Sequence, residues 1–371
     1  MKKILFLIGS LNGGGAERVL LQILEHLNQK EFKSYLALGS MTGEYIESVP
    51  KHVEIIDLSS SYNVFVKNIF SLNKSVNKYQ IDLIVSFMPN ANLLALRTKY
   101  FLNAGLKVIV TEHNNPHKNY LKSNFKIKSL IKKIDLKFFY RCSDKIVTVS
   151  NGIRKELIKD FNLPPKIIST IYNPANLKDI SNKKHEMPSF FRKKSNKKTI
   201  ISIGRLVTQK GYFDMLEIIK QLNEKIPVRL IILGEGPLRC EIEQKILELK
   251  LKNVVFLMGF VDNPWAYIYN SDVYLSTSLW EGFHMTIVEA MACGIFPIVS
   301  DCNYGPNEII KNEEMGKLIP VQVNKEFVNE LFLFLSKHET GYKYNACIER
   351  SKFFETSIIV EQYTKLFKSA L

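Results

Sequence analysis

Several features that mark common protein classes are missing from this sequence. No apolar run approaches the roughly 20 residues with which a helix crosses a bilayer, so any membrane contact is expected to be peripheral. The opening MKKILFLIGS has an apolar run shorter than the roughly seven to fifteen residues of a secretory signal, and no small-residue cleavage site follows it. We interpret this stretch as a first β-strand.

Cysteine pairs and metal-binding motifs are missing as well. The five cysteines are an odd number without C-x-x-C spacing, which argues against a disulfide framework or a zinc site and indicates a reducing, cytosolic compartment. There is no D-x-D pair, so a metal-chelated diphosphate of that kind is not expected, and no nucleophile elbow or Cys-His arrangement is recognisable. The chemistry is therefore expected to depend on positioning and charge.

Positive charge, in contrast, is abundant. The 371 residues are of ordinary globular composition, 46% hydrophobic and 23% charged, but carry a formal net charge of +15. Such an excess predicts an anionic partner and leaves open whether it is nucleic acid, acidic lipid or a phosphorylated substrate. Because no base-reading module or aromatic RNA signature is present, specific nucleic-acid binding is not expected.

Apolar runs alternate with helix-period segments along both halves of the chain. The runs are KILFLIG, SYLALGS, VEIIDL, DLIVSFM, KVIVTEH, DKIVTVS and IISTIYN, then TIISIGRL, VRLIILGEGP, NVVFLMGF, DVYLSTS, FPIVSD and GKLIPV. This alternation predicts parallel sheets covered by helices, and the length predicts two domains. We expect an α/β protein with Rossmann-like domains over residues 1–178 and 199–356 and a polar, basic linker over 179–198.

A Gly-rich turn, GSLNGGGAERVL, follows the first predicted strand. Gly14 and Gly15 would offer backbone N–H groups and a helix N-terminus to an anion there. The spacing is neither the dinucleotide fingerprint, since Arg18 stands where a further glycine belongs, nor a P-loop. A plain tight turn is the alternative interpretation.

Cations and a histidine follow other predicted strands. Arg205 and Lys210 bracket the loop after TIISIG and are suited to clamping a diphosphate, although exposed cations are common in loops. His113 ends KVIVTEH, where it is either a hydrogen-bond donor to a substrate hydroxyl or phosphate or a structural residue. His284 is close to the same predicted site, and the sequence indicates no role for it.

Two glutamates lie in SLWEGFHMTIVEAMACGIFPIVSD. Glu281 is expected at the carboxyl end of a strand, and Glu289 on the inner face of the following helix, which Gly294 ends. Ligands of open α/β sheets bind at the carboxyl ends of strands, and a carboxylate accepts hydrogen bonds from both hydroxyls of a diol. The pair predicts a site for a hydroxyl-rich ligand, the alternative being two solvated glutamates beside a core helix.

The segment from Asn119 to Arg141 concentrates positive charge, with seven Lys or Arg against one Asp and apolar residues between them. A basic amphipathic stretch of this kind predicts contact with an anionic membrane surface or an anionic substrate. An outer helix with a solvated basic face is the alternative.

In this order, the motifs GGGAER, TEH, GRLVTQKG, GEGP, GF and EGFHMTIVEAMACG resemble those of the retaining glycosyltransferases of family 4. The resemblance covers nearly the whole chain and is most specific between Ile200 and Glu308. It implies the GT-B fold, with two Rossmann-like domains facing a central cleft. It also implies that the final helix, residues 357–371, crosses back to the first domain.

The resemblance further implies roles for individual residues. Glu289 would hold the nucleotide ribose and Glu281 would lie beside the donor sugar, while the backbone around Val261 would pair with the base. The residues implied to bind the donor are Gly14, Gly15, Arg205, Lys210, Val261, Gly282, Phe283 and Glu289. Those implied in catalysis are Glu281, His113, Arg205 and Lys210.

The activity implied is retaining transfer of a hexose or N-acetylhexosamine from a UDP-sugar, without cofactor or metal, to a glycan linked to polyprenyl diphosphate. The stretch SDCNYGPNEII resembles bacterial enzymes that assemble surface polysaccharide or oligosaccharide, which implies work at the inner face of the cytoplasmic membrane. The alternatives are a GDP-mannose-dependent mannosyltransferase and a catalytically silent GT-B scaffold that binds nucleotide sugar.

Overall fold

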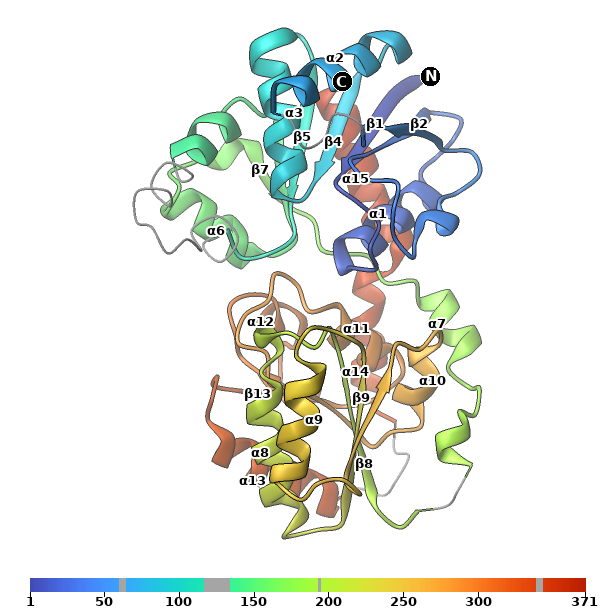
Figure 1. The fold of residues 1–371 in the computed structure, drawn as a ribbon, viewed down its shortest axis with the longest axis vertical. Helices are drawn as coiled ribbons and strands as arrows, with labels where there is room; N and C mark the ends of the chain where they lie inside the picture. Colours follow the sequence, from blue (N-terminus) through green and yellow to red (C-terminus); the bar gives the residue numbers. More distant parts are fainter. Residues whose placement is uncertain (60–64, 117–133, 193–194, 338–342) are drawn as a thin grey trace. The chain divides into compact units, whose positions relative to one another are not determined.

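The computed structural model describes residues 1–59, 65–116, 134–192, 195–337 and 343–371. The chain forms two compact units. Unit 1 comprises Met1–Pro174 and Thr356–Leu371, and unit 2 comprises Ala175–Glu355. Each unit contains one parallel sheet (Figure 1).

The sheet of unit 1 has seven strands in the order β3-β2-β1-β4-β5-β6-β7. Every residue of β4 is buried, as expected for a parallel strand with helices over both faces, and this is why such strands appear in the sequence as continuous apolar runs. The strands are β1 (Lys2–Ile8), β2 (Phe32–Leu38), β3 (Glu54–Asp57), β4 (Leu83–Phe87), β5 (Lys107–Glu112), β6 (Lys145–Thr148) and β7 (Ile168–Thr170).

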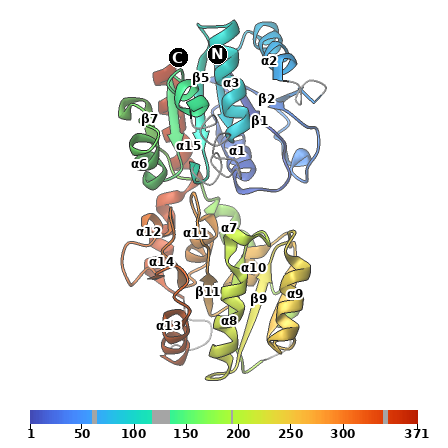
Figure 2. The same cartoon turned by 60° about the vertical axis from the view of Figure 1, so that its left-hand side comes forward.

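Helices cover both faces of this sheet (Figures 1 and 2). On one face α1 (Gly15–His26) packs against α15 (Thr356–Ala370), and on the other α2 (Phe65–Tyr79) packs against α3 (Pro89–Leu102). Further elements of this unit are a helix over residues 134–140, α6 (Asn151–Lys159), η1 (Ile46–Ser48) and η2 (Pro165–Ile167).

The last helix, α15, completes the core of unit 1. The ring of Phe367 lies 6.2 Å from that of Phe6 on β1 and 6.2 Å from that of Phe32 on β2, and Tyr363 beside it is fully buried. Aromatic rings at this spacing add to the burial of apolar surface. The return of the final helix to the first domain is therefore confirmed.

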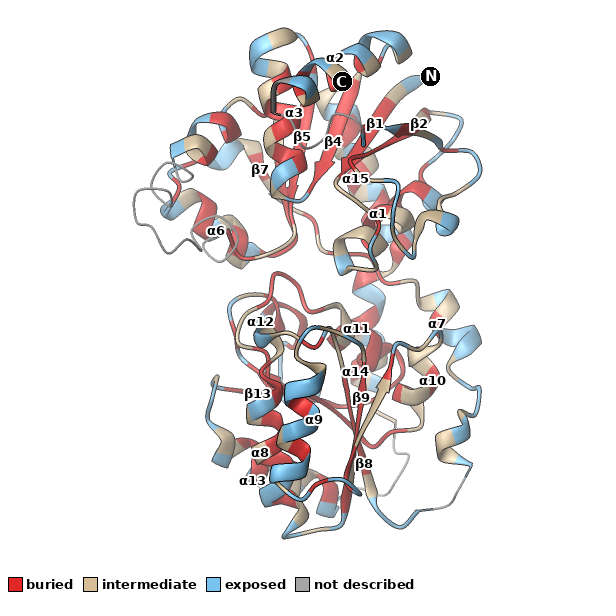
Figure 3. Cartoon of the chain, in the orientation of Figure 1, coloured by how far each residue is buried: buried red, intermediate tan, exposed pale blue. Residues whose placement is uncertain are grey.

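The sheet of unit 2 has six strands in the order β10-β9-β8-β11-β12-β13. The strands are β8 (Lys198–Ile203), β9 (Val228–Leu233), β10 (Val255–Gly259), β11 (Val273–Ser276), β12 (Pro297–Ser300) and β13 (Lys317–Ile319). The helices are α8 (Tyr212–Asn223), α9 (Arg239–Glu248), α10 (Pro264–Tyr269), α11 (Met285–Ala292), α12 (Pro306–Ile309), α13 (Asn324–Lys337) and α14 (Asn345–Ser351). Figure 3 shows the central strands of both sheets buried and the outward faces of helices such as α9 exposed.

Residues 179–198, expected as a linker, fall within unit 2. They include most of α7 (Leu177–Lys183), whose N-terminus is capped by the side chain of Asn176, and the single turn η3 (Ser189–Phe191). Lys184 then donates to the carbonyl of Ala292 at 3.5 Å. The segment is polar because much of it is exposed, yet these contacts attach it to the second sheet's helices.

The strand orders place a switch point in each sheet, where consecutive crossovers leave in opposite directions. It lies between β1 and β4 in unit 1 and between β8 and β11 in unit 2. Ligands of open α/β sheets bind in the crevice beside the carboxyl ends of strands at such a point. The Gly-rich turn follows β1, and the loops carrying Lys210 and Glu281 follow β8 and β11.

No helix in the described ranges is both long and apolar enough to cross a bilayer.

Candidate functional site

The loops after β8 and β11 meet at the switch point of unit 2. Gly211 has a φ of +64°, and a Cβ there would lie 2.2 Å from the carbonyl oxygen of Thr277, so only glycine allows this approach. The hydroxyl of Thr277 donates to the carbonyl of Gly211 at 2.9 Å. The backbone N–H of Leu279 donates to the carbonyl of Gln209 at 2.8 Å. These contacts fix the two loops relative to each other.

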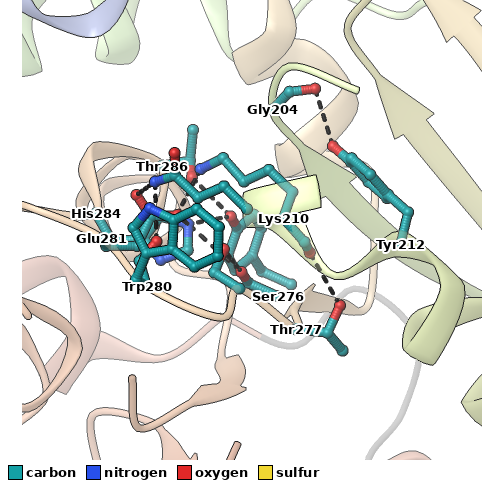
Figure 4. Close-up of polar contacts among 12 residues, drawn as sticks. Gly204, Lys210, Tyr212, Ser276, Thr277, Trp280, Glu281, His284 and Thr286 are labelled. Atoms are coloured by element: carbon teal, nitrogen blue, oxygen red, sulfur yellow. Dashed lines mark hydrogen bonds and ion pairs between the residues drawn. The ribbon is translucent and has the colours of Figure 1, made fainter. Parts of the chain in front are cut away.

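Lys210 and Glu281 form an ion pair across these loops (Figure 4). The Nζ of Lys210 lies 2.6 Å from Oε1 of Glu281, and the two side chains are 18% and 8% exposed. Burial raises the pKa of the Glu281 carboxyl, but the charge of Lys210 and the hydrogen bonds from Lys210 and Ser278 together outweigh burial and hold that pKa below its ordinary value. Glu281 is therefore an anion at neutral pH, bound to a cation one strand away.

A buried histidine lies beside this pair. The Nε2 of His284 is 3.8 Å from Oε1 of Glu281, 3.3 Å from the hydroxyl of Tyr274 and 3.5 Å from that of Ser276. Burial lowers the pKa of His284 to about 4, so the ring is neutral at physiological pH. The hydroxyl of Tyr274 also lies 2.6 Å from that of Thr286. This network supports Glu281 from inside the protein (Figure 4).

The backbone of Glu281 is held from the opposite side by the loop after β12. Its N–H donates to the carbonyl of Asn303 at 2.9 Å, and its carbonyl accepts from the N–H of Tyr304 at 2.8 Å. Gly305 has a φ of +106°, and a Cβ there would lie 3.0 Å from Cα of Phe283. Three strand-end loops thus converge on one carboxylate.

The structure brings other predicted residues to the same edge of the sheet. Glu289 is on α11 and 2% exposed, which confirms its inward direction. Arg205 directly follows β8 and is exposed, and its guanidinium makes no hydrogen bond or ion pair with the described residues. Val261 is half-buried in the loop after β10, and Phe283 packs its ring 5.4 Å from that of Phe354.

In unit 1 the Gly-rich turn begins α1. Gly14 is the N-cap and Gly15 the first helical residue, and no side chain caps the helix. A Cβ added to Gly15 would meet nothing within 4 Å, so its backbone faces open space. The turn therefore has the uncapped N–H groups that the sequence predicts for anion binding.

His113 directly follows β5. Its ring stacks on Phe87 at 5.2 Å, and its Nε2 lies 3.0 Å from the hydroxyl of Thr111. That hydroxyl donates its hydrogen to the carbonyl of Ser86 at 2.8 Å, so it accepts from Nε2 and the ring hydrogen is assigned to Nε2. Nδ1 is then an acceptor, so the ring offers a ligand an acceptor and not the donor expected from the sequence. Burial lowers the pKa of His113 to about 3, so the ring is neutral.

Beneath His113 lies a polar network that the sequence did not reveal. The side-chain amide of Asn92 donates to Oε1 of Glu112 at 3.1 Å and to the carbonyl of Thr111 at 2.9 Å. The hydroxyl of Tyr140 donates to the same oxygen of Glu112. Ser86 donates to the amide oxygen of Asn92 at 2.8 Å. These residues join β4, β5, α3 and the helix over residues 134–140.

Most of the basic segment Asn119 to Arg141 lies outside the described residues. Its described end is helical over 134–140, where Ile134 and Phe138, one turn apart, are 59% and 48% exposed. In the described part of the chain, no group of three or more His, Cys, Asp or Glu residues is arranged to hold a metal ion.

The sequence did not indicate Gln209, Tyr274 or Asn92, and it placed His284 near the site without a role. Gln209 stood directly beside a residue already singled out, and its position in that loop was the available signal. Asn92 is a polar residue in the first turn of a helix that follows a buried strand, which is a weaker signal.

Two family models together match most of the chain. The model described as glycosyltransferase family 4 matches residues 13–179, and that described as glycosyl transferases group 1 matches residues 183–352. The crystal structure of a glycosyltransferase from Rickettsia africae ESF-5 superposes with a TM-score of 0.81 at 19% sequence identity. The superposition covers 100% of this chain and 98% of the Rickettsia chain. This likeness shows the fold.

Relatives match over similar lengths. An uncharacterized glycosyltransferase of Methanocaldococcus jannaschii is 31% identical over 347 residues, 82% of this chain and 84% of its own. The N-acetylgalactosamine-N,N'-diacetylbacillosaminyl-diphospho-undecaprenol 4-alpha-N-acetylgalactosaminyltransferase of Campylobacter jejuni is 29% identical over 365 residues, 96% of each chain. The UDP-Gal:alpha-D-GlcNAc-diphosphoundecaprenol alpha-1,3-galactosyltransferase of Escherichia coli is 26% identical, over 85% of this chain and 84% of its own. With its two parallel sheets, its returning helix and these matches, the chain belongs to glycosyltransferase family 4, the retaining hexosyltransferases of GT-B fold.

Proposed function

We propose that this protein transfers a hexose or N-acetylhexosamine from a UDP-sugar to a glycan carried on polyprenyl diphosphate. The observation that carries the proposal is the Lys210–Glu281 pair at the switch point of unit 2, with Arg205 exposed on the neighbouring strand end. This edge of the sheet therefore combines two cations that can bind a diphosphate with a carboxylate that can accept hydrogen bonds from sugar hydroxyls.

The substrates are proposed from the relatives. The names of two of them specify an undecaprenol-linked diphosphate acceptor, and one of these names UDP-galactose as the donor. Both match this chain over at least four-fifths of its length. A UDP-sugar and a lipid-linked glycan are therefore the first substrates to test.

In the proposed reaction, Arg205 and Lys210 stabilise the negative charge that develops on the departing diphosphate. The bond between the anomeric carbon and the diphosphate oxygen breaks, and the acceptor oxygen attacks the same face. The acceptor proton passes to the departing diphosphate. Glu281 holds hydroxyls of the sugar, Glu289 holds the ribose, and His113 accepts a hydrogen bond from the sugar at Nδ1.

The first experiment is calorimetric titration of the purified protein with UDP and with GDP, in the presence of EDTA. Binding of UDP alone supports the proposal and the expectation of a metal-independent site. Binding of GDP alone would replace the donor with a GDP-sugar. If UDP binds, transfer from UDP-sugars to a polyprenyl-diphosphate-linked saccharide is measured next, and binding without any transfer would favour a silent scaffold.

The proposed acceptor is anchored in a membrane, and the basic segment is proposed to contact that membrane. Replacing Lys126, Lys132 and Lys133 by glutamate should reduce binding to vesicles that contain anionic lipid, because each basic residue near such a surface contributes about 1 kcal/mol. Vesicles of neutral lipid are the control. Equal binding by the variant and the unmodified protein would contradict this part of the proposal.

A further inference from the structure

Gln209 connects the two loops of the unit 2 site through its side chain. Its Nε2 lies 3.2 Å from Oε2 of Glu281 and 2.8 Å from the carbonyl oxygen of Trp280. An ionised carboxylate and a carbonyl only accept hydrogen bonds, so the amide nitrogen must face them and both of its hydrogens are donated. The backbone carbonyl of Gln209 accepts from the backbone N–H of Leu279. Gln209 is therefore bound to three successive residues of the loop after β11.

Gln209 and Lys210 bind different oxygens of the same carboxylate. Lys210 lies 2.6 Å from Oε1 of Glu281, and Gln209 lies 3.2 Å from Oε2. The terminal torsion of a glutamate is broad and easily turned when it is unrestrained. A donor on each oxygen fixes the plane of the carboxylate, and with it the direction of the lone pairs that remain for a ligand.

We propose that Gln209 is a positioning residue for sugar transfer, which orients Glu281 toward the donor and keeps Lys210 on the opposite oxygen. The proposal rests on the function proposed for Glu281 above. Both amide hydrogens of Gln209 are already donated within the protein, so its side-chain nitrogen has no hydrogen left for a substrate. Loss of Gln209 should therefore slow transfer without weakening nucleotide binding.

Two variants test this. Q209M keeps the length of the side chain and removes both donors, and it should lower kcat about tenfold, as loss of a hydrogen bond to a charged group does. The dissociation constant for UDP should change by less than about twofold, because no ligand contact is removed.

The pH dependence of kcat in Q209E distinguishes a positioning role from a purely structural role, because a purely structural role would not change it. Its new carboxyl group faces Oε2 of Glu281, where it can donate when protonated and repels when ionised. The kcat of Q209E relative to the unmodified protein should therefore fall as the pH rises from about 5.5 to 8.

The native groups around this position keep their charge over that range. Burial lowers the pKa of His284 to about 4, and burial raises the pKa values of Tyr212, Tyr274 and Cys302 above their ordinary values. Lys210 holds the pKa of Glu281 below its ordinary value against the effect of burial. A pH dependence confined to Q209E is therefore assigned to the new carboxyl group.

Gln244→Met is the matched control, since Gln244 on α9 also donates to a glutamate, Glu248, at 3.1 Å but is exposed. It should leave kcat unchanged, and melting curves verify that all variants are folded. Unchanged kcat in Q209M, a loss confined to UDP affinity, or parallel pH profiles for Q209E and the unmodified protein would each overturn the inference. Failure of the proposed function appears instead in the unmodified protein, as absence of UDP binding and transfer, and would overturn both.

Discussion

Each unit buries a glutamate at the carboxyl end of a central strand, and the two differ in what holds them. Glu112 ends β5 and receives hydrogen bonds from the amide of Asn92 and the phenol of Tyr140. Glu281 follows β11 and receives an ammonium, that of Lys210, on one oxygen and an amide, that of Gln209, on the other. The carboxyl ends of central strands thus carry different chemistry in the two units, at β5 in one sheet and after β11 in the other.

The difference indicates how the work is divided. Neutral donors around Glu112 make a rigid support for the neutral ring of His113, which suits contact with uncharged hydroxyls. The ammonium at Glu281, with the exposed Arg205 beside it, suits an anionic diphosphate. If this comparison is right, charge-changing substitutions should be far more harmful in unit 2 than in unit 1.

The largest effect is expected from Lys210→Met. It removes the cation that we propose stabilises the leaving group, and it leaves a buried carboxylate without its counter-ion. We expect kcat/KM for transfer to fall about 100-fold to 1000-fold, as when a stabilising donor is removed from an active site. The free energy of unfolding at neutral pH should fall by about 3 kcal/mol, since breaking a buried pair exposes the full cost of the remaining charge.

The same variant should reverse the pH dependence of stability. In the native protein the pKa of Glu281 is lowered, so the pair's stabilisation is complete above the ordinary carboxyl pKa and is lost as the pH falls through the lowered value. Without Lys210, burial, the largest influence on this carboxyl, is opposed only by weaker interactions such as the hydrogen bonds from Ser278 and Gln209, and it raises that pKa. The melting temperature of Lys210→Met should then rise as the pH is lowered from about 7 to 5.

Lys245→Met is the control for this experiment, because Lys245 forms a more exposed ion pair with Glu217 at 2.9 Å in the same unit. Exposed pairs contribute about 0–1 kcal/mol, so its melting and transfer should stay close to native. If Lys210→Met and Lys245→Met have similar melting temperatures and transfer rates, the Lys210 ion pair has no special role in stability or transfer.

A smaller effect is expected in unit 1, from His113→Phe. The substitution keeps the stacking on Phe87 but removes the acceptor at Nδ1, and kcat should fall about tenfold to 100-fold. Because the pKa of His113 is about 3, the native pH–rate profile should have no inflection near 6.5 from this ring. An inflection there that disappears in His113→Phe would show that the ring titrates during turnover.

Glu289→Gln should weaken binding of UDP about tenfold, because an amide is a poorer acceptor for the two hydroxyls of a ribose than a carboxylate. Its effect on kcat at saturating donor should be smaller than that of Lys210→Met. Titration calorimetry measures the affinity, and Glu248→Gln on the exposed face of α9 is the control. If the native protein and Glu289→Gln bind UDP with equal affinity, the ribose is bound by another residue.

The smallest effect is expected from Gly15→Ala. The added methyl group meets no atom of the protein and improves the helix propensity of α1 by up to about 1 kcal/mol, so the melting temperature should stay equal or rise. Transfer should nonetheless slow about twofold to fivefold if a diphosphate approaches this backbone, since the methyl group would occupy its space. Gly105→Ala, in the turn before the amino end of β5 and so away from the carboxyl ends of the strands, should change neither property.

The strands were predictable because parallel strands are buried on both faces. Runs such as DLIVSFM contain few polar residues, so β4 was recognisable without any partner, and the same holds for the other strands of both sheets. The order of the strands was not recoverable from these runs, because pairing joins residues distant in the chain. Residues 179–198 were misleading for a related reason. Composition indicates exposure, whereas hydrogen bonds with distant residues, from Lys184 to Ala292 and from Asn263 to Lys183, attach this segment to unit 2.

Residues of the candidate site were chosen from the sequence, but their contacts were not predictable from it. Glu281, Glu289, Arg205 and Lys210 were selected from strand ends and from the family resemblance, and the structure brings the loops of Lys210 and Glu281 together. Lys210 and Gln209 are 71 and 72 positions away from Glu281 in the sequence. Their hydrogen bonds to its two carboxylate oxygens form only because folding brings the two loops together. A sequence records such pairings only through the glycine that permits the approach, Gly211.

The returning helix also bears on how the chain acquires its fold during synthesis. Ala175 and Glu355, where the chain leaves unit 1 and where it goes back, are joined by an isolated parallel bridge, with Ala175 donating to Phe354 at 2.7 Å. Until α15 emerges from the ribosome, Phe6 and Phe32 lack the aromatic ring of Phe367 that covers them. Unit 1 is translated first yet completed last, so the nascent chain must keep an unfinished core from aggregating while all of unit 2 is made.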